Sequence, residues 1–223
     1  MALVKSEPKT LALGDLSIGG TAFNGWQVQP DHPSVQAALE AALSQFADHP
    51  ISVICAGRTD TGVHATHQVV SFTSVARRPS AGWIRGVNAI LPESVAVRWM
   101  REVDEKFHAR FSARSRTYEY WIWNDPVRSP LFEGSAGWVF RPLDEALMQR
   151  ARRRSSVNTT LRVSVRQSAK PRRRCARSAN FKIVRRGALV GVRITAMLFA
   201  AHGAKHRWRA YLCGHRGGKG QSG

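Results

Sequence analysis

The last acidic residue of the chain is Glu145, and residues 147–223 contain 20 Lys and Arg but no Asp or Glu. The first 146 residues hold 14 basic and 15 acidic side chains, so the net charge of +19 arises in the later part. Surfaces of globular domains normally mix both signs, because unpaired like charges repel one another. This break in charge predicts an ordinary domain before residue 147 and a segment that packs poorly after it.

The size of the chain allows one large domain or two small ones. Its 223 residues are 43% hydrophobic, which is enough to form a core. No run of eighteen apolar residues occurs, and the opening MALVKSEPKTLALG has too short an apolar stretch for a secretory signal. Three widely spaced cysteines, Cys55, Cys175 and Cys213, suit reduced thiols better than disulfides. These features predict a cytoplasmic protein without a membrane span.

Apolar periodicity predicts a mixture of helices and strands. Residues 35–47 have the pattern of an amphipathic helix with Ser34 as its N-cap. Residues 80–91 predict a second helix, with a Ser cap and a stop at Pro92. Strands are expected at 51–57, 67–74, 95–103 and 116–124, with a hairpin at 180–196 around Arg186 and Gly187. This order favours an α+β fold built on antiparallel sheets.

The basic part of the chain contains two stretches without any clear period. Residues 149–178 carry three arginine clusters, and the chain after Ala196 ends in a glycine-rich tail. A segment without helical or strand periodicity cannot bury one face. We therefore expect residues 147–179 and 197–223 to be disordered or out of register.

The stretch CAGRTDTGVHA, residues 55–65, has the composition of a tight loop that carries chemistry. A short β-branched run ends at Gly57, and Gly62 follows, so the backbone there can bend closely around a ligand. Arg58 stands two residues before Asp60, where it can keep the carboxylate ionised or bind a phosphate. An ionised carboxylate on a rigid loop is suited to nucleophilic attack.

Two other interpretations of this loop are open. Arg58 and Asp60 can form an inert surface ion pair, with the neighbouring threonines satisfying backbone groups. Asp60, His64, His67 and Cys55 can also be considered as metal ligands of a hydrolase. No second acid or thiol cluster follows at ligand spacing, however, so we expect no metal site.

Five segments in the same order resemble the TruA family of tRNA pseudouridine synthases. The longest is CAGRTDTGVHATHQVVSF, which contains the loop. The others are GTAFNGWQVQP at 20–30, GVNAILP at 86–92, FHARFSARSRTYEY at 107–120, and residues 124–130. The resemblance covers residues 20–146.

This resemblance implies a pseudouridine synthase fold of two similar halves, with antiparallel sheets flanked by helices and a cleft between them. The halves would be residues 1–105, which carry the loop, and residues 106–223. The implied activity is isomerisation of uridine to pseudouridine at positions 38–40 of the tRNA anticodon stem-loop, by a homodimer. No cofactor is implied, because the base itself serves as the electron sink.

The family motif also implies roles for individual residues. Asp60 matches the nucleophile, which attacks the flipped uridine at C6 or at C1′ of the sugar. Arg58 matches the residue that pairs with this Asp and helps to flip the base. Tyr118 matches a tyrosine that stacks on the base and is a candidate acceptor of the C5 proton; an ordinary sheet aromatic is the alternative. The implied tRNA contacts are Arg78, Phe107, His108, Ala109, Arg110 and Phe111.

The chain departs from the family pattern in its first strand, at 151–178 and after Ala196. The stretch SSVNTTLRV, residues 155–163, can be encoded so that a shifted frame reads VGEHDFTS, a family-like motif. Residues 202–208 are likewise compatible with a shifted MVRNIVG. We therefore hypothesise small insertions or deletions in the gene or its recorded sequence. The alternative function is then an inactive, frameshifted family member that acts at most as a basic RNA-binding protein.

Overall fold

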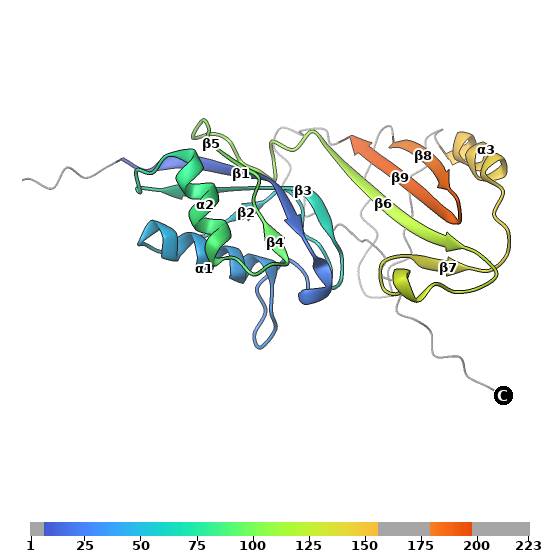
Figure 1. Ribbon diagram of the computed structural model, residues 1–223. Helices are drawn as coiled ribbons and strands as arrows, with labels where there is room; N and C mark the ends of the chain where they lie inside the picture. The colour runs from blue at the N-terminus through green and yellow to red at the C-terminus, as the bar shows by residue number, and fades with distance from the viewer. Residues whose placement is uncertain (1–6, 156–178, 198–223) are drawn as a thin grey trace, which may run out of the picture. The chain divides into compact units, whose positions relative to one another are not determined.

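The computed structural model describes residues 7–155 and 179–197, which separate into two compact units (Figure 1). The described residues of the first unit are 7–113, and those of the second are 114–155 and 179–197. Each unit has its own sheet, and together they form the mixed α+β architecture with largely antiparallel strands that the sequence predicts.

The sheet of the first unit is antiparallel throughout. Its strands are β1 (Lys9–Ile18), β2 (Ile54–Cys55), β3 (Ala65–Ser74), β4 (Val95–Ala96) and β5 (Trp99–Glu102). The central strand β1 pairs with β3 on one side and with β4 and β5 on the other, and β2 forms the edge beyond β3. Leu13 of β1 lies opposite Val70 of β3, and both are fully buried.

Two helices, α1 (Val35–Ala47) and α2 (Ser80–Ile90), pack beside each other against this sheet (Figure 1). The helix expected at 35–47 is confirmed, and its N-cap Ser34 accepts a hydrogen bond from the amide of Ala37. Leu39 and Leu43 of α1 are fully buried with Trp83 of α2. Burial of these large side chains is the main driving force for this unit.

The strand expected at 51–57 was too long, because side chains of α1 bind its first part. The amide of Ile51 donates to the Ser44 hydroxyl (2.8 Å), and the amide of Val53 donates to a Glu40 carboxylate oxygen (2.9 Å). Only Ile54 and Cys55 therefore pair with β3. Side chains of α1 thus accept the hydrogen bonds of two backbone amides that the sequence pattern had assigned to strand pairing.

The strand expected at 95–103 is divided into β4 and β5 for a similar reason. The side-chain amide of Asn88, on α2, accepts from the Val97 amide and donates to the Val97 carbonyl, both at 2.8 Å. These bonds replace strand pairing at that residue. The N-cap position of α2 is Pro79, which makes no side-chain capping bond, so the expected cap Ser80 is instead the first helical residue.

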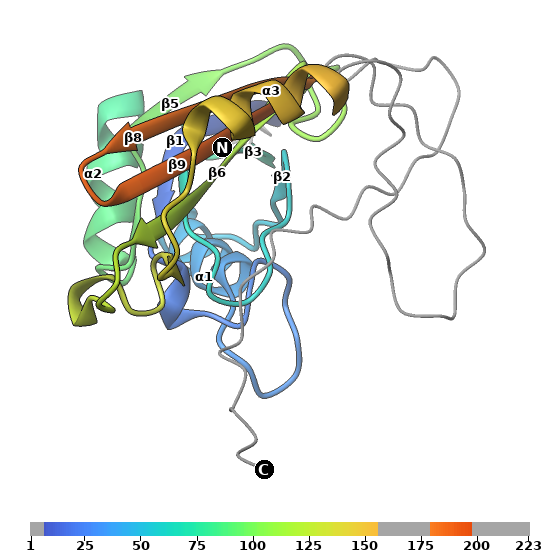
Figure 2. The same cartoon turned by 90° about the vertical axis from the view of Figure 1, so that its right-hand side faces the viewer.

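The second unit is a four-stranded sheet in the order β7-β6-β9-β8, with helix α3 against β8 (Figure 2). Its elements are β6 (Ser115–Asn124), β7 (Gly137–Val139), α3 (Glu145–Ser155), β8 (Ala179–Arg186) and β9 (Leu189–Met197). The expected hairpin around Arg186 and Gly187 is confirmed, and Gly187 has a φ of 59°, which favours glycine. One pair, β6 with β7, is parallel.

Asn124, at the end of β6, ties several parts of the second unit together. Its side-chain nitrogen donates to the carbonyls of Val139 (2.8 Å) and Arg141 (2.7 Å). Its side-chain oxygen accepts from the amide of Leu143 (3.0 Å) and from Arg185 of β8 (3.1 Å). All four hydrogen-bonding positions of the side chain are used, which suits a partly buried amide.

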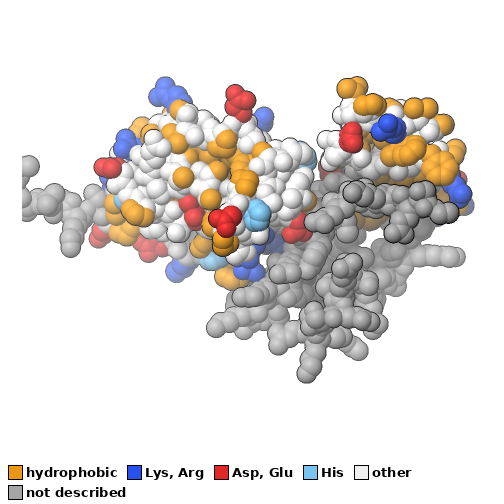
Figure 3. All heavy atoms as spheres, turned by 90° about the horizontal axis from the view of Figure 1, so that it is seen from below, with side chains coloured by type: hydrophobic (Ala, Val, Ile, Leu, Met, Phe, Trp, Pro, Cys, Tyr) orange, Lys and Arg blue, Asp and Glu red, His pale blue; other side chains and the backbone are white. Residues whose placement is uncertain are grey.

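The surface of the first unit is not strongly basic. Residues 7–113 contain nine Lys and Arg against ten Asp and Glu, and Figure 3 shows charges of both signs scattered over one face. Any recognition of a polyanion by this unit therefore depends on individual side chains rather than on bulk charge.

The described residues also include two short 3-10 helices, Gly20–Ala22 and Pro130–Phe132. Within the two described ranges, no helix is both long and apolar enough to cross a membrane.

Candidate functional site

The loop of residues 56–64 connects the edge strand β2 to β3, and it carries Arg58 and Asp60. Both side chains are exposed. The carbonyl of Asp60 accepts from the amide of Val63 (3.1 Å), which closes a tight turn, and Gly62 within this turn has a φ of 77°. The loop therefore presents an accessible carboxylate at the tip of a turn.

The segment of residues 20–26 packs directly on the backbone of this loop. The amide of Trp26 donates to the carbonyl of Thr59 (2.9 Å), and Trp26 is itself buried. A Cβ built on Gly25 would lie 2.9 Å from that same Thr59 carbonyl oxygen, and Gly25 has a φ of 99°. A glycine is needed there for both the conformation and the close approach.

A second close approach occurs at the other end of the turn. A Cβ built on Gly20 would lie 2.2 Å from the carbonyl oxygen of Val63, so no larger residue fits without movement of the loop. The amide of Gly20 also donates to Nδ1 of His64 (3.3 Å). The sequence indicated GTAFNGWQVQP only as a family-like segment, and its role as the support of the loop became evident from these contacts.

The segment FHARF lies against β3, the strand that the loop enters. The amide of Ala109 donates to the hydroxyl of Ser71 (3.2 Å), and Ala109 is buried at 2% exposure. His108 and Phe111 form a ring pair with centroids 4.2 Å apart, and Phe111 is 62% exposed. Since Ser71 lies opposite Ile54 of β2, this segment and the loop belong to the same part of the first unit.

Arg78 is far along the unit from Asp60. It follows the end of β3, whereas the loop precedes its start, and a ten-residue strand spans about 30 Å. Its guanidinium lies over the ring of Phe46, 4.6 Å from the centroid. The segment FHARF thus packs on β3 beside its pairing with β2, the strand that precedes the loop, whereas Arg78 follows the other end of β3.

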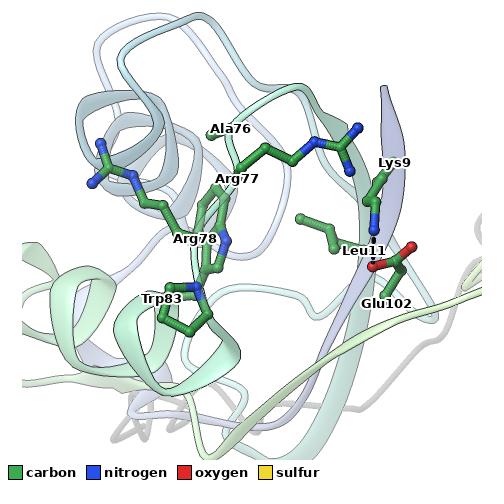
Figure 4. A pocket seen from close by; sticks show the side chains of 8 residues that line it. Lys9, Leu11, Ala76, Arg77, Arg78, Trp83 and Glu102 are labelled. Atoms are coloured by element: carbon green, nitrogen blue, oxygen red, sulfur yellow. Dashed lines mark hydrogen bonds and ion pairs between the residues drawn. The ribbon is translucent and has the colours of Figure 1, made fainter. Parts of the chain in front are cut away.

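A shallow pocket of about 290 Å³ lies beside Arg78 (Figure 4). Its cations already have partners: Lys9 pairs with Glu102 (2.6 Å), and Arg77 donates to the carbonyl of Glu7 (3.3 Å). The side chains of Arg77 and Arg78 point apart (Figure 4). They do not converge on one ligand position, so this pocket is not the candidate site.

Tyr118 lies on β6 of the second unit, opposite Ile194 of β9. Its side chain is partly buried, and this burial raises the pKa of the Tyr118 phenol, while the positive charge of Arg116 opposes the shift to a smaller degree. The phenol is therefore neutral at physiological pH.

We expect Tyr118 to ionise above the ordinary pKa of 10.0. Because the folded state favours the neutral phenol, this contribution to stability is present below pH 10 and is lost as the pH rises further. The difference in absorbance at 295 nm between the wild-type chain and Tyr118→Phe isolates this phenol. Its midpoint should fall to the ordinary value in urea, and a native midpoint at or below 10 would contradict the assignment.

The histidines near Asp60 are engaged in local hydrogen bonds. Nδ1 of His64 accepts from the amide of Gly20, and Nδ1 of His67 lies 2.8 Å from the hydroxyl of Thr66. Among residues 7–155 and 179–197, no three His, Cys, Asp or Glu side chains are grouped so that they could hold a metal ion.

Comparison with known proteins gives one consistent family. A family profile described as tRNA pseudouridine synthase matches residues 17–112, which include the supporting segment, the loop and FHARF. The chain is 53% identical over 143 residues to tRNA pseudouridine synthase A of Bordetella petrii, covering 63% of this chain and 53% of that protein. It is 57% identical over 136 residues to tRNA pseudouridine synthase A of Herminiimonas arsenicoxydans, covering 59% and 50%.

A third relative gives the same picture. Against tRNA pseudouridine synthase A of Dechloromonas aromatica, the identity is 54% over 141 residues, covering 63% of this chain and 53% of that protein. The chain thus matches about half the length of these relatives.

Proposed function

We propose that this chain is a member of the tRNA pseudouridine synthase family, whose profile matches residues 17–112, and that it isomerises uridine to pseudouridine in tRNA with Asp60 as the nucleophile. The observation that carries this proposal is the loop of residues 56–64. This loop exposes the Asp60 side chain to solvent. The backbones of Gly20, Gly25 and Trp26 pack against the backbone of the loop. The substrate position is one or more of the uridines at 38–40 in the anticodon stem-loop.

The proposed reaction is a balanced rearrangement without a net change in composition. A carboxylate oxygen of Asp60 forms a bond to the uracil C6 or to the ribose C1′, and the N1–C1′ bond breaks. The base then rotates, and C5 bonds to C1′. The bond to Asp60 is released, and the proton on C5 is transferred to solvent, while N1 gains one. The uracil ring accommodates the electrons at each stage, so no cofactor is required.

Arg58 has a role in exposing the target base in this proposal. A base within a stem must leave its stack, which costs a few kcal/mol. The exposed guanidinium of Arg58, two residues before Asp60, can occupy the vacated space and contact phosphate. Tyr118 contributes a ring face for stacking; as a neutral phenol it suits this role better than accepting the C5 proton.

The remaining residues contact the tRNA away from the reacting base. The partly exposed ring pair of His108 and Phe111, with Arg110 beside it, offers a stacking and phosphate-binding surface. Phe107 and Ala109 shape this segment, since Ala109 anchors it to β3. Arg78, which lies beyond the far end of β3, would contact a separate part of the tRNA backbone.

The described residues divide after Ala113, somewhat later than the halves 1–105 and 106–223 that the sequence predicted. The complete enzyme would act as a homodimer and reside in the cytoplasm. Two observations favour the alternative of an inactive, frameshifted member. The relatives match only about half of their own length, and residues 147–223 lack any carboxylate. Of the segments expected to be disordered or out of register, residues 147–155 form most of α3, and Ala179 and Met197 belong to β8 and β9. The rest, residues 156–178 and 198–223, lies outside the described part of the structure with nearly all of the family-like shifted readings.

Release of tritium from tRNA containing 5-tritiated uridine tests the function directly, because formation of the C5–C1′ bond expels the C5 hydrogen. We expect release from the full chain that saturates with tRNA concentration. Binding of the same tRNA is measured in parallel by filter retention. Binding without release, with the chain in excess over tRNA, would support the inactive alternative. Release that disappears when uridines 38–40 are replaced by cytidine would locate the substrate.

A further inference from the structure

Gln68 is a buried polar residue on β3 whose side chain bonds to the start of the loop. It is 8% exposed. Its amide oxygen accepts from the amide of Gly57 (3.3 Å), and its amide nitrogen donates to the carbonyl of the same Gly57. The oxygen also accepts from the amide of Val69 (3.2 Å). Both backbone groups of Gly57 are thus held by one side chain.

This pair of bonds extends the β2–β3 ladder by one position. The last backbone bond on this side runs from the amide of Ala56 to the carbonyl of Val69 (2.8 Å). Continuing the register of Cys55 opposite Val70 would place Gly57 opposite Gln68. There the side-chain amide takes over from the backbone, because an amide group carries the same donor and acceptor as a peptide unit. The chain direction is therefore fixed immediately before Arg58.

We infer that Gln68 is a positioning residue for the catalytic loop, acting on Arg58 and Asp60 through Gly57. The loop is then held at three places: Gln68 at Gly57, Trp26 at Thr59, and Gly20 at Val63 and His64. Of these three contacts, only the one at Gly57 is made by a side chain of β3, that of Gln68, and a substitution can remove it. Displacement of a nucleophile by about 1 Å costs about a hundredfold in rate, so a side chain that fixes this direction affects turnover.

A purely structural role for Gln68 makes a different prediction. A buried amide that only satisfies the sheet would, when replaced, lower the stability of the whole unit. Replacing a residue that positions the loop would instead loosen the loop locally and leave the stability of the rest of the unit unchanged. Arg58 and Arg77 provide a trypsin site in the loop and one beyond the far end of β3, and both side chains are exposed. Cleavage at these two bonds therefore separates the local effect from the global one.

The test is limited trypsin digestion of the full chain with Gln68→Met, followed by mass spectrometry of the two cleavage products. Methionine keeps the approximate volume but makes neither bond to Gly57. We expect cleavage after Arg58 to accelerate by about tenfold, as loss of two hydrogen bonds to partly buried backbone groups predicts, with cleavage after Arg77 unchanged. Thr73→Met, at an exposed position of the same strand, is the matched control and should alter neither site.

Equal cleavage after Arg58 in the wild type and Gln68→Met would overturn the inference, as would acceleration at both sites together. If the Met variant does not fold, Gln68→Glu decides the question. It retains the acceptor for the Gly57 amide but places a carboxylate against the Gly57 carbonyl. Faster cleavage confined to Arg58 supports positioning, and unchanged cleavage overturns it.

The effect of Gln68 on turnover rests on the proposed synthase function, whereas its effect on the loop does not. In the tritium assay we expect kcat of Gln68→Met to fall by about 10- to 100-fold, with a smaller change in KM for tRNA, since only the contact of Arg58 with phosphate would be weakened. A kcat equal to that of the wild type, together with faster cleavage after Arg58, would overturn the positioning role. A wild-type chain that releases no tritium would count against the synthase proposal alone, since the digestion result stands by itself.

Discussion

Replacement of Asp60 by Asn is expected to abolish tritium release from uridine-labelled tRNA while leaving tRNA binding within about twofold of the wild type. The amide has nearly the same shape as the carboxylate but is not a nucleophile. Removing the covalent step from an enzyme of this kind lowers kcat by at least about 1,000-fold. Binding is retained because the proposed contacts of Arg58 and of the ring pair His108–Phe111 do not involve the Asp60 side chain.

Asp31→Asn is the matched control for this prediction. Asp31 is an exposed aspartate in a loop, with a φ of 59° that asparagine also tolerates. It removes the same charge from the same unit, so release and binding should both stay near the wild-type values. If Asp60→Asn released tritium at the rate of Asp31→Asn, Asp60 would not be the nucleophile.

Replacement of Gly20 by Ala is expected to lower the free energy of unfolding by about 3 kcal/mol, at the upper end for one methyl group forced into a packed site. The new Cβ would lie 2.2 Å from the Val63 carbonyl oxygen and 2.3 Å from its carbon. These are backbone atoms, so no rotamer change relieves the overlap, and the turn that carries Asp60 must move. Urea denaturation followed by tryptophan fluorescence measures the change, and tritium release should fall with it.

Gly62→Ala separates this overlap from the loss of glycine flexibility. Gly62 has a φ of 77°, but a Cβ there meets no atom within 4 Å. The cost is then only that of the left-handed conformation, about 1 kcal/mol. Similar destabilisation by the two substitutions would show that the close approach of Gly20 to Val63 does not support the loop.

The sequence predicted the elements that depend on local patterns. The apolar face of residues 35–47 and its cap Ser34 gave α1 with its observed bounds, and the turn at Arg186 and Gly187 gave the β8–β9 hairpin. The strands at 51–57 and 95–103 were wrong in extent. There, Glu40, Ser44 and Asn88 on the helices bind strand amides, and a periodic pattern contains no information on such distant side chains.

The sequence by itself determined which reactive residues the loop carries, Arg58 and Asp60 between glycines. It also showed that the acidic residues end at Glu145. Only the tertiary structure decided what holds that loop. Gly20, Trp26 and Gln68 contact its backbone, yet none of them lies within it. The physical reason is that these contacts are made to peptide groups, which every residue shares. The type of a residue therefore does not reveal which distant residue will bond to the peptide groups of the loop. That is decided only when the strands pair.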